Sequence, residues 1–194
     1  MDAFSYVMTL VAIIVGLGIA HILSGIGQAI HRLRGHGAPI RLEAVYLLWV
    51  GTIFIWLISF WWFEYKFYEL QTEWTFGLYT FIVVYAVVLY MVAIILVPSN
   101  MEEMHDSYEY FFSGRKWFFS LMVLLVVVDN IDSVLKGVGW GLRPINLVVS
   151  FIFLTSFSVG TFATNRKTQL VSAAAAFTAN FSYMFIELAT LGDW

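Results

Sequence analysis

The sequence has no cysteine and few charged residues, and both shortages exclude classes of function. Without cysteine the chain cannot form disulfide bonds, thiolate metal sites or thiol nucleophiles, and its redox compartment stays undetermined. Only 12% of the residues are charged, the net charge is −3, and no basic block of the kind that grips nucleic acid occurs. We therefore expect no nucleic-acid partner.

Sequence motifs of common enzymes and cofactor sites are also missing. There is no G-x-x-x-x-G-K-[ST], G-x-G-x-x-G, H-E-x-x-H or G-x-S-x-G. Lys136 lies at the end of its apolar stretch, which argues against a retinal Schiff base. His31, His36 and His105 lie outside the predicted hydrocarbon core, which argues against a bis-histidine haem. The sequence predicts no particular cofactor and does not favour an enzymatic activity.

What the chain has in excess is apolar and aromatic residues, at 61% and 19%. A soluble domain is usually about 45–50% apolar and about 25% charged. A soluble globule of 194 residues has too much surface for its volume to hide this many apolar side chains. The composition predicts an all-α polytopic membrane protein in contact with a lipid bilayer. At roughly 20 residues a span, its length allows about six transmembrane helices in a single domain, with no separate catalytic or sensor domain.

Six apolar stretches divide the chain, each long enough for a helix that crosses the hydrocarbon core. The alternation typical of membrane β-strands is absent, so helices are expected to satisfy the backbone. The N-terminus lacks the positive region of a cleaved signal peptide, and we interpret the first stretch as a retained helix. The predicted spans are residues 4–30, 42–63, 74–97, 117–136, 142–164 and 168–191.

The distribution of lysine and arginine predicts the orientation of the bundle. Seven of these residues follow the odd-numbered spans, and three follow the even-numbered ones. The seven are Arg32, Arg34, Arg41, Arg115, Lys116, Arg166 and Lys167, and the three are Lys66, Lys136 and Arg143. Positive charge is retained on the cytoplasmic side during insertion. We expect a multi-pass protein of the cell (inner or plasma) membrane, with both termini non-cytoplasmic.

The connection after the third span is patterned as an amphipathic helix over residues 100–112, lying in the inner interface. Its apolar stripe is Met101, Met104, Tyr108 and Phe111, and its polar stripe is Glu102, His105, Asp106 and Glu109. Glu-x-x-His with flanking acids is a spacing found in helical metal sites, so the polar stripe is a candidate metal site. No second Glu-x-x-His exists to complete such a site, and a solvated acidic face explains the stripe as well.

The fourth span carries the polar residues that most need an explanation, because charge at membrane depth costs about 2.5–3.5 kcal/mol per group. Asp129, Asp132, Ser133 and Lys136 share one helical face, and Asp129 falls near the midplane if the span begins at Trp117. On a functional interpretation, Asp129 and Asp132 bind a cation or relay a proton. On a structural one, Lys136 neutralises Asp132, while Asp129 is protonated or bonded to a serine, threonine or asparagine of a neighbouring helix. Asn180, His21 and Glu187 are secondary candidates for the ion-binding site.

The first span has small residues on two faces, which predicts close helix packing. One face contains His21 together with Gly18, Gly25 and Gln28. On a functional interpretation His21 carries a proton or binds a metal; on a structural one it forms a hydrogen bond across a helix contact. The other face is formed by Gly16, Ala20 and Ser24. Faces of this kind also suit association of copies into a homo-oligomer.

Three functions are compatible with these patterns. The first is a small channel or transporter for a cation or proton, using the acids of the fourth span. The second is a non-transporting accessory or sensing subunit, in which the acids only fix helix pairing. The third, less favoured, is a membrane-embedded metal-dependent enzyme acting around His105.

Overall fold

The computed structural model describes residues 3–70 and 73–187, except for the side chain of Glu187, and this part of the chain is helical without a strand. It confirms the predicted all-α class. The long helices are α1 (Ala3–Leu33), α2 (Ala44–Glu69), α3 (Phe76–Leu96), α4 (Ser107–Leu135), α6 (Pro144–Phe162) and α7 (Arg166–Glu187). Two short elements join them, the 3-10 turn η1 (Met101–Glu103) and the single turn α5 (Val138–Gly141).

Five of these helices, α1, α2, α3, α4 and α6, are long and apolar enough to cross a membrane. The sixth long helix, α7, has 22 residues but is more polar. Its polar residues Gln169, Ser172 and Asn180 are buried against the rest of the bundle. The span predicted at 168–191 matches most of α7, and its last residues lie outside the described part.

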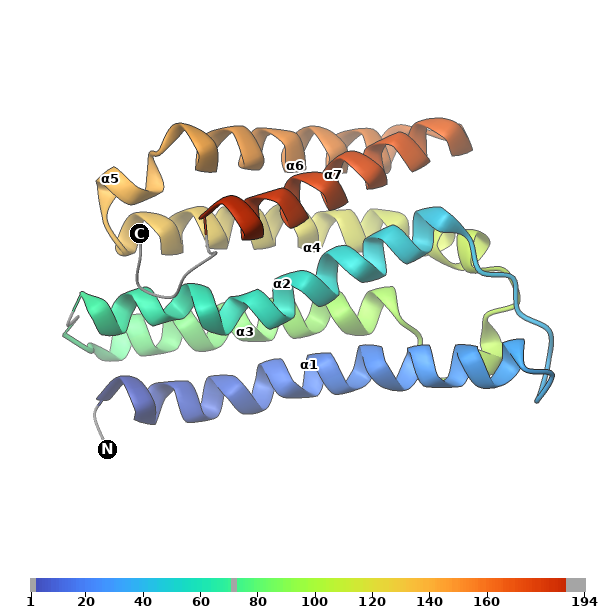
Figure 1. The fold of residues 1–194 in the computed structure, drawn as a ribbon, viewed down its shortest axis with the longest axis horizontal. Coiled ribbons are helices and arrows are strands. Elements are labelled where there is room, and N and C mark those ends of the chain that lie inside the picture. Colours follow the sequence, from blue (N-terminus) through green and yellow to red (C-terminus); the bar gives the residue numbers. More distant parts are fainter. Residues whose placement is uncertain (1–2, 71–72, 188–194) are drawn as a thin grey trace.

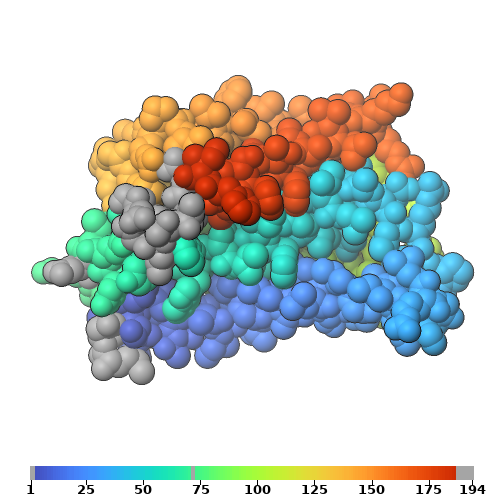
Figure 2. All heavy atoms as spheres, in the orientation of Figure 1, coloured from blue at the N-terminus to red at the C-terminus, as the bar shows by residue number. Residues whose placement is uncertain are grey.

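The long helices run alternately up and down in one bundle (Figure 1). α1 packs against α3 and α2, α4 lies between α3 and α6, and α7 packs on α6 and α2. Figure 2 shows α7 lying along α2 on the viewed face. Because α2 contacts α1, α3, α4 and α7, it occupies the centre, and polar residues on its inner face, such as Thr52 and Glu64, are fully buried.

The connections from α1 to α2, α3 to α4 and α6 to α7 meet at one end of the bundle, which we call the basic end (Figure 1). Arg34 and Arg41 lie in the first of these connections, and Arg166 and Lys167 begin α7. The connections from α2 to α3 and from α4 to α6 lie at the opposite end. The predicted charge asymmetry is thus an asymmetry between the two ends of the molecule.

The predicted helix over residues 100–112 is wrong, because two backbone features divide this segment. Residues 101–103 form only the turn η1, and Met104 and Asp106 are extended, with Asp106 bridged to Arg41. The carboxylate of Asp106 then accepts hydrogen bonds from the amides of Tyr108 and Glu109 and caps α4. Residues from Ser107 onward belong to α4, which begins ten residues before the predicted start at residue 117.

The two small faces of α1 differ in what they contact. A Cβ at Gly18 would lie 2.9 Å from a methyl group of Leu57, and Gly25 lies directly against Val97, so this face packs closely as predicted. The other face does not pack against the described part of the chain. Gly16, Ala20 and Ser24 are exposed, and nothing lies within 4 Å of a Cβ at Gly16.

Candidate functional site

Three charged side chains are buried together near the end opposite the basic end, and we call them the buried triad: Glu64, Asp132 and Lys136. The ammonium of Lys136 forms an ion pair with the Asp132 carboxylate one helical turn away, as the spacing predicts. It also lies 3.0 Å from Oε1 of Glu64, which comes from α2. None of the three side chains is exposed. The triad therefore joins the end of α4 to the central helix.

The surroundings of the triad are aromatic. Lys136 Nζ lies 3.9 Å from the ring centre of Phe63 and 5.0 Å from that of Phe67. One oxygen of each acid, Oε2 of Glu64 and Oδ1 of Asp132, is buried without a hydrogen-bond partner. Two carboxyls thus share one ammonium, and an ionised carboxylate oxygen that is buried and unpartnered is costly. A proton on one of the two acids would remove that imbalance.

Asp129 lies one turn before Asp132 but in a different environment. Its Oδ1 accepts a hydrogen bond of 2.6 Å from the hydroxyl of Tyr85 on α3, and that hydroxyl accepts one of 3.3 Å from the indole of Trp56. The Asp129 side chain is also partly accessible, whereas Asp132 is fully buried. Because α4 begins at Ser107, Asp129 lies roughly 12 Å past the midpoint of the helix, away from the basic end.

Asp129 faces a small polar cavity of about 50 Å³ between α2, α3, α4, α6 and α7. A volume of this kind holds about three or four water molecules. Nine of the fifteen residues that line it have polar side chains, namely Ser59, Tyr85, Asp129, Asn130, Ser133, Asn146, Ser150, Asn180 and Tyr183. The remaining residues are Trp56, Phe60, Phe63, Val149, Phe153 and Met184. The cavity combines a carboxyl, several amides and hydroxyls, and aromatic rings.

Hydrogen bonds between helices hold the cavity walls in place. Asn130 and Ser150 bond to each other across α4 and α6, with Asn130 donating at 3.0 Å. Asn146 accepts from the hydroxyl of Tyr183 at 3.1 Å. Asn180, a predicted site residue, lines this cavity and donates to the carbonyl of Thr52 at 3.0 Å. Satisfied amides of this kind fix the positions of α4, α6 and α7 around Asp129.

His21 is not among the described residues that line this cavity. Nε2 of His21 lies 2.8 Å from the carbonyl oxygen of Val97, at the C-terminal end of α3. That contact is the helix-packing role foreseen for His21. Glu187 is the last residue of α7, and its side chain lies outside the described part.

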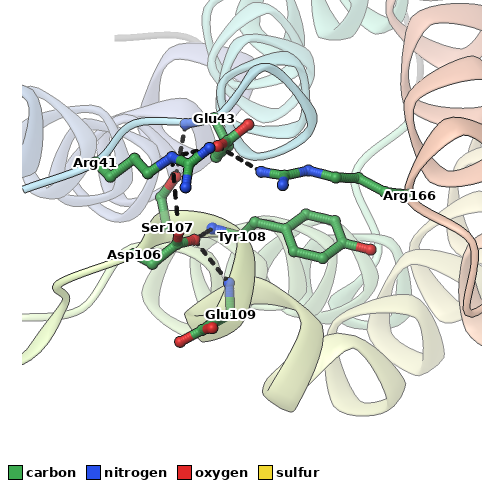
Figure 3. Close-up of polar contacts among 7 residues, drawn as sticks. All are labelled: Arg41, Glu43, Asp106, Ser107, Tyr108, Glu109 and Arg166. Carbon is green, nitrogen blue, oxygen red and sulfur yellow. Dashed lines mark hydrogen bonds and ion pairs between the residues drawn. The ribbon is translucent and has the colours of Figure 1, made fainter.

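The candidate metal ligands near the basic end do not come together. Asp106 caps α4 through the amides of Tyr108 and Glu109 (Figure 3). Glu102, His105 and Glu109 are exposed. Among the residues that the structure describes, no group of three or more histidine, aspartate or glutamate side chains could hold a metal ion.

This region contains an ion-pair network instead, which ties the connections of the basic end together (Figure 3). Glu43 forms ion pairs with Arg41, at 2.8 Å, and with Arg166 at the start of α7. Its amide donates to the hydroxyl of Ser107 at 2.8 Å, and the Arg166 guanidinium lies over the ring of Tyr108. The network links α2, α4 and α7.

Sequence reasoning missed Glu64 and Tyr85. The predicted second span ended at residue 63, which assigned Glu64 to a connection, whereas α2 continues to Glu69. The available signal was spacing: Trp56, Phe60, Glu64 and Phe67 follow one another at helical intervals and form one buried face.

No protein-family model, curated protein or solved structure matches this chain.

Proposed function

We propose that this chain is a proton-exchanging membrane transporter and that Asp129 is the group that takes up and releases the proton. One observation carries the proposal: Asp129 has accessible surface in a polar cavity, while Asp132 and Glu64 are sealed around Lys136. A carboxyl must reach water or a mobile donor in order to exchange a proton, and Asp129 meets that condition.

The balance of charge around the cavity supports the same proposal. Asp129, Asp132 and Glu64 lie close together, and the cation paired with two of them is Lys136. Three ionised carboxylates beside one ammonium would leave negative charge in a medium of low dielectric constant, at a cost of several kcal/mol. A proton on Asp129 lowers that cost, and its loss leaves a carboxylate that Tyr85 stabilises through a charge-assisted hydrogen bond.

The cavity supplies the means for the proton to leave Asp129. About three water molecules fit beside hydroxyl and amide groups, which suits a short hydrogen-bonded chain. Exchange then consists of an O–H bond breaking at Asp129 and the proton passing to water in the cavity, with the reverse step on uptake. The triad holds α2 and α4 in register while this happens.

Proton flux into vesicles tests the proposal. The purified protein is reconstituted into liposomes that contain a pH-sensitive dye, and a potassium diffusion potential drives proton entry. We expect the protein to accelerate the pH change over empty liposomes and Asp129→Asn to abolish the acceleration, because an amide cannot carry the proton. Asp106→Asn is the matched control, since asparagine also caps a helix and the residue lies far along α4 from the cavity.

Two results would contradict the proposal. If Asp129→Asn transports protons as well as the unchanged protein, Asp129 is not the exchanging group. If the folded, reconstituted protein itself is silent, the non-transporting accessory role becomes the better explanation of the acids.

A further inference from the structure

A second hollow lies beside the polar cavity, between α2 and α7, and is open on its outer side. It measures about 390 Å³, within the range of sites that take molecules of drug size. Ile55, Ile58 and Trp62 line it from α2, and Phe181 and Phe185 line it from α7. Four of these residues are exposed on the outside of the bundle, and the least exposed of the four, Trp62, is 36% exposed. We call this hollow the α2–α7 groove.

The α2–α7 groove and the polar cavity share two lining residues, Ser59 and Met184. Ser59 is small, and its hydroxyl is bonded back to the carbonyls of Ile55 and Trp56 in its own helix. Methionine is unbranched and adapts its shape easily. The apolar groove on the outside of the bundle and the cavity that contains Asp129 thus adjoin at one small and one adaptable side chain.

We infer that the cavity and the groove form one lateral binding site for a lipophilic primary amine. The ammonium group lies at Asp129, and the hydrocarbon chain lies in the α2–α7 groove. The inference rests on the proposed function, because the ammonium group and the proton compete for the same carboxyl of Asp129.

Charge, ring faces and size all select this kind of head group. Asp129 offers a carboxylate, and the triad, with two acids and one ammonium, adds no more than one net negative charge, which disfavours anions. Trp56, Phe60 and Phe153 bring aromatic rings to the same cavity, and ring faces attract cations. The cavity holds only a few waters, so a primary ammonium group fits while a bulky quaternary one does not.

The exchange at Asp129 balances in protons and charge. A neutral amine enters from the bilayer through the groove and takes the proton of the Asp129 carboxylic acid. One O–H bond breaks, one N–H bond forms, and the resulting ammonium and carboxylate neutralise each other. Release reverses the step, or a proton from water replaces the ammonium ion as the partner of the carboxylate.

Binding of three ten-carbon probes tests the head-group assignment. Radiolabelled decylamine, decanol and decanoate are equilibrated with the protein in nanodiscs of neutral lipid, and uptake by protein-free nanodiscs is subtracted. We expect saturable binding of decylamine, with decanol and decanoate at least about tenfold weaker. Asp129→Asn should weaken decylamine by about tenfold or more, which is the effect of losing about 1.4 kcal/mol. Equal binding of all three probes would mean a plain lipid groove and overturn the inference.

A second pair of variants tests the lateral route. Met184→Trp places a bulky ring between the groove and the cavity, and Leu170→Trp places the same ring at an exposed position elsewhere on α7. We expect Met184→Trp to lose decylamine binding and Leu170→Trp to keep it. Ser59→Leu closes the same opening from α2 if Met184→Trp does not give a monodisperse protein. Unchanged decylamine binding in a closed variant would refute the lateral route.

The two proposals fail in different ways. Proton flux that depends on Asp129, without selective decylamine binding, overturns the amine site and leaves the proton exchanger standing. Selective, Asp129-dependent decylamine binding without proton flux overturns the proton exchanger and leaves the amine site standing.

Discussion

Arg32 is a buried guanidinium at the end of α1 that is held by backbone carbonyls. It donates to Ala38 at 2.7 Å, Pro39 at 2.9 Å and Met104 at 3.0 Å, and also to Met101. These carbonyls belong to the connections that follow α1 and α3. A planar group with five donors satisfies this arrangement, whereas the point charge of lysine does not. Arg32 therefore serves as a clamp at the basic end.

Arg32→Lys should lower the free energy of unfolding by about 2–3 kcal/mol, because buried carbonyls lose charged donors. The effect is read from thermal unfolding of the detergent-solubilised protein, followed by tryptophan fluorescence. Arg34→Lys is the matched control, since Arg34 is exposed in the same connection. If the two variants lose the same free energy of unfolding, the hydrogen bonds of the Arg32 guanidinium do not stabilise the fold.

The buried triad gives a second prediction for single residues. Lys136→Met leaves Glu64 and Asp132 buried without a cation and should cost about 3–5 kcal/mol. The triple variant Glu64→Gln, Asp132→Asn and Lys136→Met has no charge left to pair and should regain most of that stability. Thermal unfolding of both proteins is the measurement. A triple variant no more stable than Lys136→Met would mean that the charges themselves do not determine the stability of this region.

At the scale of elements, the apolar stretches predicted where most helices lie but not where they end. The third and fifth stretches, 74–97 and 142–164, agree closely with α3 and α6. Hydropathy marks only the apolar part of a helix, so it missed that α2 continues to Glu69 and that α4 begins at Ser107. Those ends depend on caps and on contacts between connections, such as the cap by Asp106.

The candidate site was predictable only within one helix. The pairing of Asp132 with Lys136 follows from a separation of four residues on α4. Glu64 and Tyr85 come from α2 and α3, and their contacts depend on the order and rotation of the helices in the bundle. The apolar pattern along the sequence does not determine that order and rotation, because many helix rotations bury an apolar surface about equally well.

Packing between α4 and α6 depends on the absence of a side chain at Gly160. A Cβ there would overlap the ring of Phe119, which is buried among the rings of Trp49, Phe118 and Phe157 and has no room to move. Gly160→Ala should therefore lower the free energy of unfolding by about 1–3 kcal/mol. Gly16→Ala meets no atom and should be neutral or slightly stabilising, because alanine favours the helix. Thermal unfolding distinguishes them, and comparable losses in both would refute the packing argument.

For the whole molecule, the two ends of the bundle offer different charges to the two sides of a membrane. The basic end gathers the connections that carry Arg34 and Arg41 together with the start of α7. The opposite end carries the triad, whose Lys136 is neutralised by buried acids. Lysine and arginine are thus more numerous towards the basic end, and their number in the connections is what biases orientation during insertion. We expect the basic end to face the cytoplasm.

Single cysteines test this orientation, because the chain has none of its own. His36→Cys places a thiol in an exposed position at the basic end, and Leu70→Cys places one at the opposite end, where Leu70 is 47% exposed. A membrane-impermeant maleimide added to intact cells should label Leu70→Cys and leave His36→Cys unlabelled until the cells are opened. Neither change alters a lysine or arginine, so the charge asymmetry stays as it is. The reverse labelling pattern would show that the basic end is translocated, and the proton of Asp129 would then exchange near the cytoplasmic side.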